Sequence, residues 1–277
     1  MQIGFIGTGS MGSIIIDALL TSRSLQPSQI IAANRTLAKV ELLAERHPGL
    51  VVAANNDEVV RRAEIVVVCV KPFEYRQALE QFADALTAQH VLITITSPIP
   101  LEDLAQLVPC PVVRVVPSIT NAALGGMVLC EFGPQATESL RKRIYQLFSA
   151  LGQPVEVTFS LLRIASDISS CGPAFLSYLL QQMIEAAVVE TGISREAATF
   201  FTTQMVLGFS KLLEKEIFTL PELEARVVVP AGITGQGLIP LKEHVPGLFH
   251  EVFKRTHQKF AEDIEEVKKY LDSMKQT

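Results

Sequence analysis

The chain has 277 residues, of which 48% are hydrophobic and 19% charged, and its formal net charge is −5. This length allows two domains with cores of their own, and the high apolar share suggests that surface is also buried between subunits. The negative charge and the lack of a Lys/Arg stripe argue against a nucleic-acid surface. The longest aliphatic run, residues 65–70, is far too short to cross a bilayer, and the N-terminus lacks a basic signal region. We expect a soluble, cytoplasmic protein that binds neither nucleic acid nor membrane.

The first segment of the chain carries a nucleotide-binding pattern. A short apolar strand at residues 3–6 runs into Gly7-Thr8-Gly9-Ser10-Met11-Gly12, after which apolar residues repeat at helical spacing. A G-x-G-x-x-G turn between a strand and a helix lets the backbone approach a pyrophosphate at the helix N-terminus, where free N–H groups favour negative charge. These six residues therefore predict a dinucleotide-binding turn.

The tip of the next strand, residues 30–33, indicates which dinucleotide is bound. NAD-binding units usually place Asp or Glu there for the ribose 2′-hydroxyl, but this chain has Asn34 and Arg35. An Arg suits a 2′-phosphate instead. The competing interpretation of Asn34 and Arg35 is an ordinary solvated loop, so NAD stays open while NADP is predicted.

The region from residue 1 to about 158 alternates strand-like and helix-like segments. Continuous apolar strands separated by amphipathic helices are typical of a parallel sheet covered on both faces. A final strand–helix–strand segment should extend one edge of the sheet. The remaining strands are expected at 51–53, 65–70, 91–95, 112–116, 127–132 and 155–158, and helices at 37–46, 75–86 and 137–151.

After residue 158 the pattern is helical to the end. The segment that starts at Gly172 is apolar on most of its faces, as at Leu176, Leu179 and Met183. Such a helix must be surrounded, and the same region of a second subunit is the natural cover. We predict a sheet domain of residues 1–158 and an all-helical dimerisation domain of 159–277, with assembly beyond the dimer left open.

The four cysteines and five histidines show no spacing typical of a metal site, and no metal is expected. Free thiols in a reducing compartment are the simplest interpretation of the scattered cysteines. No histidine is in register with Cys171, so a nucleophilic role for this thiol is not expected.

Six segments in order resemble the pyrroline-5-carboxylate reductase family, whose members reduce a cyclic imine to proline with NAD(P)H. They are residues 4–12, 34–35, 70–72, 113–117, 169–175 and 230–238. The amino-acid sequences of segments 116–121 and 165–173 are more similar to a reductase-like branch of the family, associated with late competence, than to the reductases themselves. The resemblance spans nearly the whole chain. It implies a doubly wound Rossmann sheet followed by a helical dimerisation domain, with an active site shared between two subunits.

The resemblance also implies roles for individual residues. On the cofactor side, Val70-Lys71-Pro72 would lie under the nicotinamide ribose, and Asn56 or its neighbour Asn55 would reach the adenosine. On the substrate side, Thr234 aligns with a threonine of the family's Pro-Gly-Gly-Thr-Thr loop, and its hydroxyl would hydrogen-bond the imine nitrogen. Gly232 and Ile233 belong to the same loop. A simple helix N-cap is the competing interpretation of Thr234.

The substrate-side motifs depart from the family pattern. Val229 stands where the family has a Ser that helps to hold the substrate carboxylate, and Ile233 replaces a small residue. Ser170 and Cys171 replace Gly-Ser in the family's Ser-Gly-Ser-Gly-Pro. A missing hydrogen bond to a charged group costs about 1.5–3 kcal/mol, which weakens binding about 10- to 150-fold.

Two functions from different classes therefore stay open. The first is an NADPH-dependent reductase of a cyclic imine, most simply 1-pyrroline-5-carboxylate to proline. The second is a catalytically drifted, cofactor-binding protein with a role in late competence. A reductase of another small carbonyl or imine is a third possibility.

Overall fold

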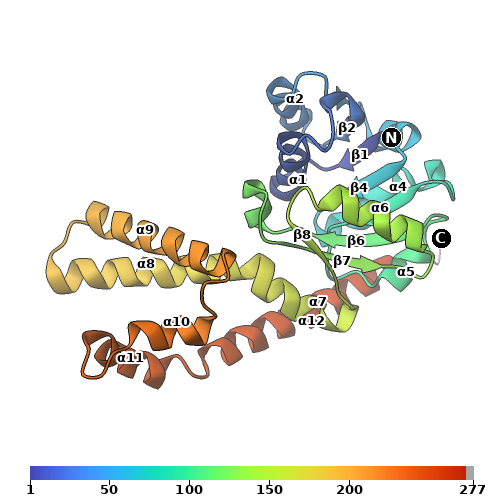
Figure 1. Ribbon diagram of the computed structural model, residues 1–277. Coiled ribbons are helices and arrows are strands. Elements are labelled where there is room, and N and C mark those ends of the chain that lie inside the picture. Colours follow the sequence, from blue (N-terminus) through green and yellow to red (C-terminus); the bar gives the residue numbers. More distant parts are fainter. Residues whose placement is uncertain (273–277) are drawn as a thin grey trace. The chain divides into compact units, whose positions relative to one another are not determined.

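The computed structural model describes residues 1–272, which divide into two compact units (Figure 1). The first unit contains residues 1–173 and the segment from Arg255 onward, and the second contains Ala174–Lys254. The strands are β1 (Ile3–Ile6), β2 (Ile30–Ala33), β3 (Val51–Val52), β4 (Ile65–Val68), β5 (Val91–Thr94), β6 (Val112–Val116), β7 (Met127–Phe132) and β8 (Gln153–Glu156). The helices up to residue 166 are α1 (Ser10–Thr21), α2 (Leu37–Arg46), α3 (Asn56–Arg62), α4 (Tyr75–Glu80), α5 (Leu101–Ala105), α6 (Glu138–Phe148) and α7 (Phe159–Ser166).

The strands of the first unit form one eight-stranded sheet in the order β3-β2-β1-β4-β5-β6-β7-β8. Strands β1 to β6 are parallel, and β7 and β8 run antiparallel to them at one edge. This is the doubly wound sheet that the sequence predicts. The strand order changes direction between β1 and β4, and ligands of such sheets bind at the carboxyl ends of the strands at this point.

Helices cover both faces of the sheet. On one face, side chains of α1, α2 and α6 belong to the buried cluster that contains Ile3 and Phe5. On the other, side chains of α3, α4 and α5 belong to the cluster that contains Ile6 and Ile31. Burial on both faces explains why β4 reads as a continuous aliphatic run, with all four residues buried. The structure confirms the predicted fold class. The boundary predicted between 158 and 159 rests on composition and stays a prediction.

Several elements differ in their bounds from the sequence prediction. The strand expected at 65–70 ends at Val68, and the helix expected at 137–151 ends at Phe148. The helix expected over 75–86 ends at Glu80, because the N–H groups of Gln81 and Phe82 bond to carbonyls three residues back instead of four. The chain continues as a short 3-10 turn at Ala83–Ala85. The last strand is Gln153–Glu156 instead of 155–158, and it pairs with β7 in parallel.

A charged pair lies inside the sheet. Arg114 on β6 is fully buried and pairs with Glu131, which lies opposite it on β7. The other guanidinium nitrogens donate to the carbonyls of Thr96, at 3.1 Å, and of Ile99, and the ring of Phe159 lies 5.4 Å away. Burial lowers the pKa of Arg114 and raises that of Glu131, because both charged forms lose water. The buried charge of Arg114 is therefore stabilised only while Glu131 and the two carbonyl groups remain in place.

The second unit has almost no core within one chain. Its helices are α9 (Arg195–Glu214), α10 (Leu220–Val227) and α11 (Ile233–His244), most of α8 (Gly172–Thr191) and the start of α12 (Leu248–Asp272). Between residues 174 and 254 only Ala198 is buried. Large apolar side chains are exposed on α8 and α9, among them Leu176, Met183, Phe200, Phe201 and Met205. Exposed apolar surface of this kind marks an interaction face.

All four cysteines are free thiols. Cys110 and Cys130 are buried as expected, whereas Cys69 and Cys171 are only partly buried. Within residues 1–272, no helix combines the length and apolar character that crossing a bilayer requires. No group of three or more His, Cys, Asp or Glu residues in that part of the chain is arranged to hold a metal ion.

Replacing Glu131 tests the buried pair. Glu131→Ala leaves the guanidinium of Arg114 buried without its counter-charge, and breaking such a pair costs about 3–5 kcal/mol. We expect a correspondingly lower free energy of unfolding in urea denaturation of the full chain. Glu41→Ala, at an exposed position of α2, is the control and should change it by less than about 0.5 kcal/mol. Equal losses in the two variants would contradict a stabilising pair.

Candidate functional site

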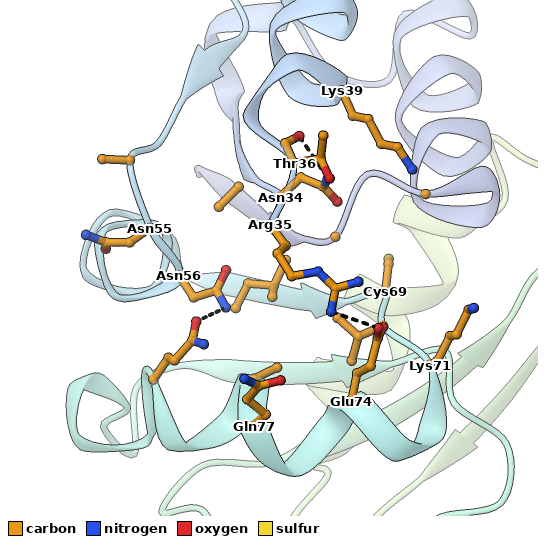
Figure 2. Close-up of a pocket in the computed structure, with 18 residues that line it drawn as sticks. Asn34, Arg35, Thr36, Lys39, Asn55, Asn56, Cys69, Lys71, Glu74 and Gln77 are labelled. Atoms are coloured by element: carbon orange, nitrogen blue, oxygen red, sulfur yellow. Dashed lines mark hydrogen bonds and ion pairs between the residues drawn. The ribbon is translucent and has the colours of Figure 1, made fainter.

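A cleft of about 440 Å³ lies at the carboxyl ends of β1, β2 and β4 (Figure 2). This is the point at which the strand order changes direction. The cleft is formed by the glycine turn, the start of α2, the start of α3 and the segment that leads into α4. Its lining residues are Ile6, Gly7, Gly9, Ala33, Asn34, Arg35, Thr36, Lys39, Ala54, Asn55, Asn56, Cys69, Val70, Lys71, Glu74, Gln77, Ala78 and Gln81.

Each of the three glycines in the turn is explained by a different structural constraint. Gly7 has a φ of +95°, and a Cβ there would lie 2.6 Å from the carbonyl oxygen of Cys69. A Cβ on Gly12 would lie 2.3 Å from the carbonyl oxygen of Gly7, so this glycine lets α1 pack against the turn. A Cβ on Gly9 would meet nothing within 4 Å. Gly9 therefore faces open space, which a pyrophosphate could approach closely.

Asn34 braces the glycine turn. Its Oδ1 accepts a hydrogen bond from the Thr8 N–H at 3.1 Å, and its Nδ2 donates to the Thr36 carbonyl at 3.0 Å. Next to it, Arg35 is mostly exposed and forms an ion pair with Glu74 at 3.1 Å. Lys39, in the first turn of α2, lines the same cleft.

The opposite wall contains the two predicted asparagines. Asn55 is the N-cap of α3, where its Oδ1 accepts from the Glu58 N–H at 2.9 Å. Asn56 donates to Gln81 at 2.8 Å. The Asn55 side chain thus caps its own helix, while the Asn56 side chain contacts Gln81 at the end of α4.

Of the predicted Val70-Lys71-Pro72 triplet, Val70 and Lys71 line the cleft and Pro72 starts the 3-10 turn Pro72–Glu74. Burial raises the pKa of the neighbouring Cys69 thiol to about 12, so this thiol is neutral at physiological pH. Thr8, Ser10, Met11 and Gly12 belong to the turn but not to the lining.

The cleft fits an anionic dinucleotide. Its charged residues are three cations, Arg35, Lys39 and Lys71, against the one carboxylate of Glu74, which gives a net charge of +2 on a chain of net charge −5. The Thr8 hydroxyl in the turn is buried without a hydrogen-bond partner. The open face at Gly9 and the excess of positive charge are features that suit a pyrophosphate, whereas the Thr8 hydroxyl lies behind the lining of the cleft.

Ser170 and Cys171 lie in a π-helical segment, Asp167–Cys171. The Ser170 hydroxyl donates to the Pro117 carbonyl at 3.1 Å. Cys171 Sγ lies 3.3 Å from a guanidinium nitrogen of Arg163. Single π turns inside helices occur frequently at functional sites, because they shift the side chains that follow.

A buried carboxylate holds this π segment. Asp167 is fully buried and accepts from Arg163 at 2.8 Å and from the Thr256 hydroxyl of α12 at 2.7 Å. The imidazole of His257 lies 3.6 Å from the same carboxylate. This network fixes the backbone that leads to Ser170 and Cys171.

The loop with the remaining predicted residues lies in the second unit. Val229 is exposed, Ala231 has a φ of +58°, and Ile233 is 91% exposed as the first residue of α11. Gly232 is the N-cap of α11. The interpretation of Thr234 as the N-cap is therefore wrong, because the extended backbone at Gly232 starts the helix two residues earlier.

Sequence reasoning did not find five polar residues of the cleft, which are Thr36, Lys39, Glu74, Gln77 and Gln81. No motif marks them. Lys39 has the one signal that could have been used, its place in the first turn of the helix predicted directly after Arg35.

Comparisons with known proteins agree with this architecture. A family model for pyrroline-5-carboxylate reductase dimerisation matches residues 160–263, and one for NADP oxidoreductase coenzyme F420-dependent matches residues 2–98. The pyrroline carboxylate reductase of Plasmodium falciparum with NADP bound shares the fold, with a TM-score of 0.81 and 22% identity over 96% of this chain and 98% of that chain.

Two curated relatives are similar over most of the sequence. ComE operon protein 4 of Bacillus subtilis is 43% identical over 97% of this chain and 98% of its own length. The pyrroline-5-carboxylate reductase of Methanosarcina acetivorans is 32% identical over 87% of this chain and 90% of its own length. With these relatives and this fold, the chain belongs to the pyrroline-5-carboxylate reductase family.

Proposed function

We propose that the protein is an NADPH-dependent oxidoreductase that reduces a cyclic imine, most simply 1-pyrroline-5-carboxylate to proline. The observation that carries the proposal is the cationic cleft around the glycine turn, in which Arg35 and Lys39 would bind the 2′-phosphate of NADP. Membership of a reductase family supports it.

NADPH, when bound, would supply the hydride. The chain's part is to hold and orient the two reactants. Gly9 and the N–H groups at the start of α1 would bind the pyrophosphate, Asn56 would reach the adenosine, and Val70-Lys71-Pro72 would lie under the nicotinamide ribose. Correct placement of two reactants can contribute about 7–11 kcal/mol, so no strong acid is needed for an imine that is already protonated.

On the substrate side, the Thr234 hydroxyl would hydrogen-bond the ring nitrogen. The free N–H groups in the first turn of α11, next to Gly232 and Ile233, suit a substrate carboxylate. Ser170 and Cys171 would line the substrate pocket. Val229 offers no hydroxyl to the carboxylate, which predicts weaker imine binding than a serine would give.

We also propose a homodimer formed through the helices of the second unit. The residues that match the dimerisation model include α8 and α9, whose apolar side chains are exposed in a single chain. Burying them against a second copy would provide the core that this unit lacks.

The alternative is a drifted, cofactor-binding protein with a role in late competence. Val229 and the altered Ser170-Cys171 pair favour it, as does the similarity to ComE operon protein 4. It predicts that NADPH binds while no imine is reduced, so the same assay separates the two functions.

The direct test is NADPH oxidation by the full chain with 1-pyrroline-5-carboxylate, followed by the absorbance of the reduced nicotinamide. We expect turnover, and we expect Thr234→Val to lower kcat/KM at least about 10-fold, the loss of one hydrogen bond to a charged group. The Kd for NADPH should not change in this variant. Normal NADPH binding without oxidation by any imine of a panel would favour the drifted protein.

A second test restores the missing hydroxyl. Val229→Ser should lower KM for 1-pyrroline-5-carboxylate by up to about 10- to 150-fold, because it returns a donor for the carboxylate. The matched control is 1-pyrroline, which has no carboxylate and should show no change. Equal effects on the two imines would contradict a role in carboxylate binding.

A third test uses the glycines of the turn. Gly9→Ala should fold normally yet bind NADPH at least about 10-fold more weakly, because its Cβ would occupy only the space for the pyrophosphate. Gly12→Ala should instead lower the free energy of unfolding by about 1–3 kcal/mol, the cost of overpacking. Thermal denaturation and fluorescence titration separate these effects. Unchanged NADPH affinity in Gly9→Ala would place the cofactor elsewhere.

A further inference from the structure

We propose that Glu74 is a specificity-determining residue, whose carboxylate competes with the 2′-phosphate of the cofactor for Arg35. The inference rests on the proposed function, in that the cleft must bind a dinucleotide. It assigns a role to the single anionic side chain among the residues that line the cleft.

The ion pair between these residues spans the entrance to the glycine turn. Arg35 follows β2 and Glu74 lies in the segment that follows β4, and β1 lies between these strands in the sheet. The pair, at 3.1 Å, therefore connects the two sides of the carboxyl end of β1, where the turn begins. Figure 2 shows Arg35 extended toward Glu74, with Cys69 and Lys71 beside them.

The pair is weak enough to be displaced. The side chains of Arg35 and Glu74 are 81% and 37% exposed, so solvent screens their attraction. A phosphate carries more charge than a carboxylate and can accept two parallel hydrogen bonds from one guanidinium. The 2′-phosphate of NADPH should displace Glu74 as the partner of Arg35. NADH has only a hydroxyl at this position, so Arg35 adds little to its binding affinity.

Glu74 therefore has two effects on the cleft. It holds Arg35 across the cleft before the cofactor arrives, and it lowers NADPH affinity because the pair must open. Removing its charge should tighten NADPH binding and leave NADH binding nearly unchanged, which increases the preference for NADPH.

The test compares Glu74→Gln with the wild-type full chain in fluorescence titrations with NADPH and NADH. We expect NADPH to bind about 5-fold more tightly, which corresponds to about 1 kcal/mol, and NADH to change by less than about twofold. Glu80→Gln is the matched control, because Glu80 is paired with Arg76 on α4 outside the cleft lining. It should change neither affinity.

An Arg35→Ala background tests the competition itself. There, Glu74→Gln should lose most of its effect on NADPH, and an undiminished gain would show plain repulsion and overturn the proposal. Weaker NADH binding in Glu74→Gln would also overturn it, since Glu74 would then hold the ribose hydroxyls. Wild-type protein that binds neither dinucleotide would instead reject the proposed function.

Discussion

The close approach of backbone at the start of the chain is the constraint on which the cofactor cleft depends. Without side chains at Gly7 and Gly12, the turn folds against Cys69 and α1 packs against the turn. Any Cβ there would push β1, β4 and α1 apart. The reversal of strand order between β1 and β4 then leaves room beside Gly9 that no side chain fills.

The two compact units meet the requirement for a core in different ways. In the first, both faces of a mostly parallel sheet are covered, and even a charged pair, Arg114 and Glu131, is buried with its partners. In the second, Ala198 alone is buried between residues 174 and 254. Helices that expose so much apolar surface need a partner, which agrees with the match of this region to a dimerisation model.

Electrostatics distinguishes the cofactor side from the substrate side. Positive charge is concentrated in the cleft although the chain is acidic, and the weak Arg35–Glu74 pair keeps one cation extended there. In the loop at Val229–Thr234, Val229 offers no hydroxyl and both Val229 and Ile233 are exposed. The cleft thus carries features that favour NADP binding, while the proposed substrate loop offers no hydroxyl at Val229 for an imine carboxylate.

Local patterns in the sequence determined most of the sheet, the glycine turn and the family. Each depends on residues close together in the chain: apolar runs predict strands, and the G-x-G-x-x-G spacing predicts the turn. Only the tertiary structure placed Glu74 opposite Arg35, Gln81 opposite Asn56 and Glu131 opposite Arg114. These partners lie 17 to 39 residues apart, and strand order and helix packing bring them together. The start of α11 likewise depends on the extended backbone at Gly232. The sequence suggested Thr234 as the N-cap because threonine favours that position, but backbone conformation cannot be inferred from it.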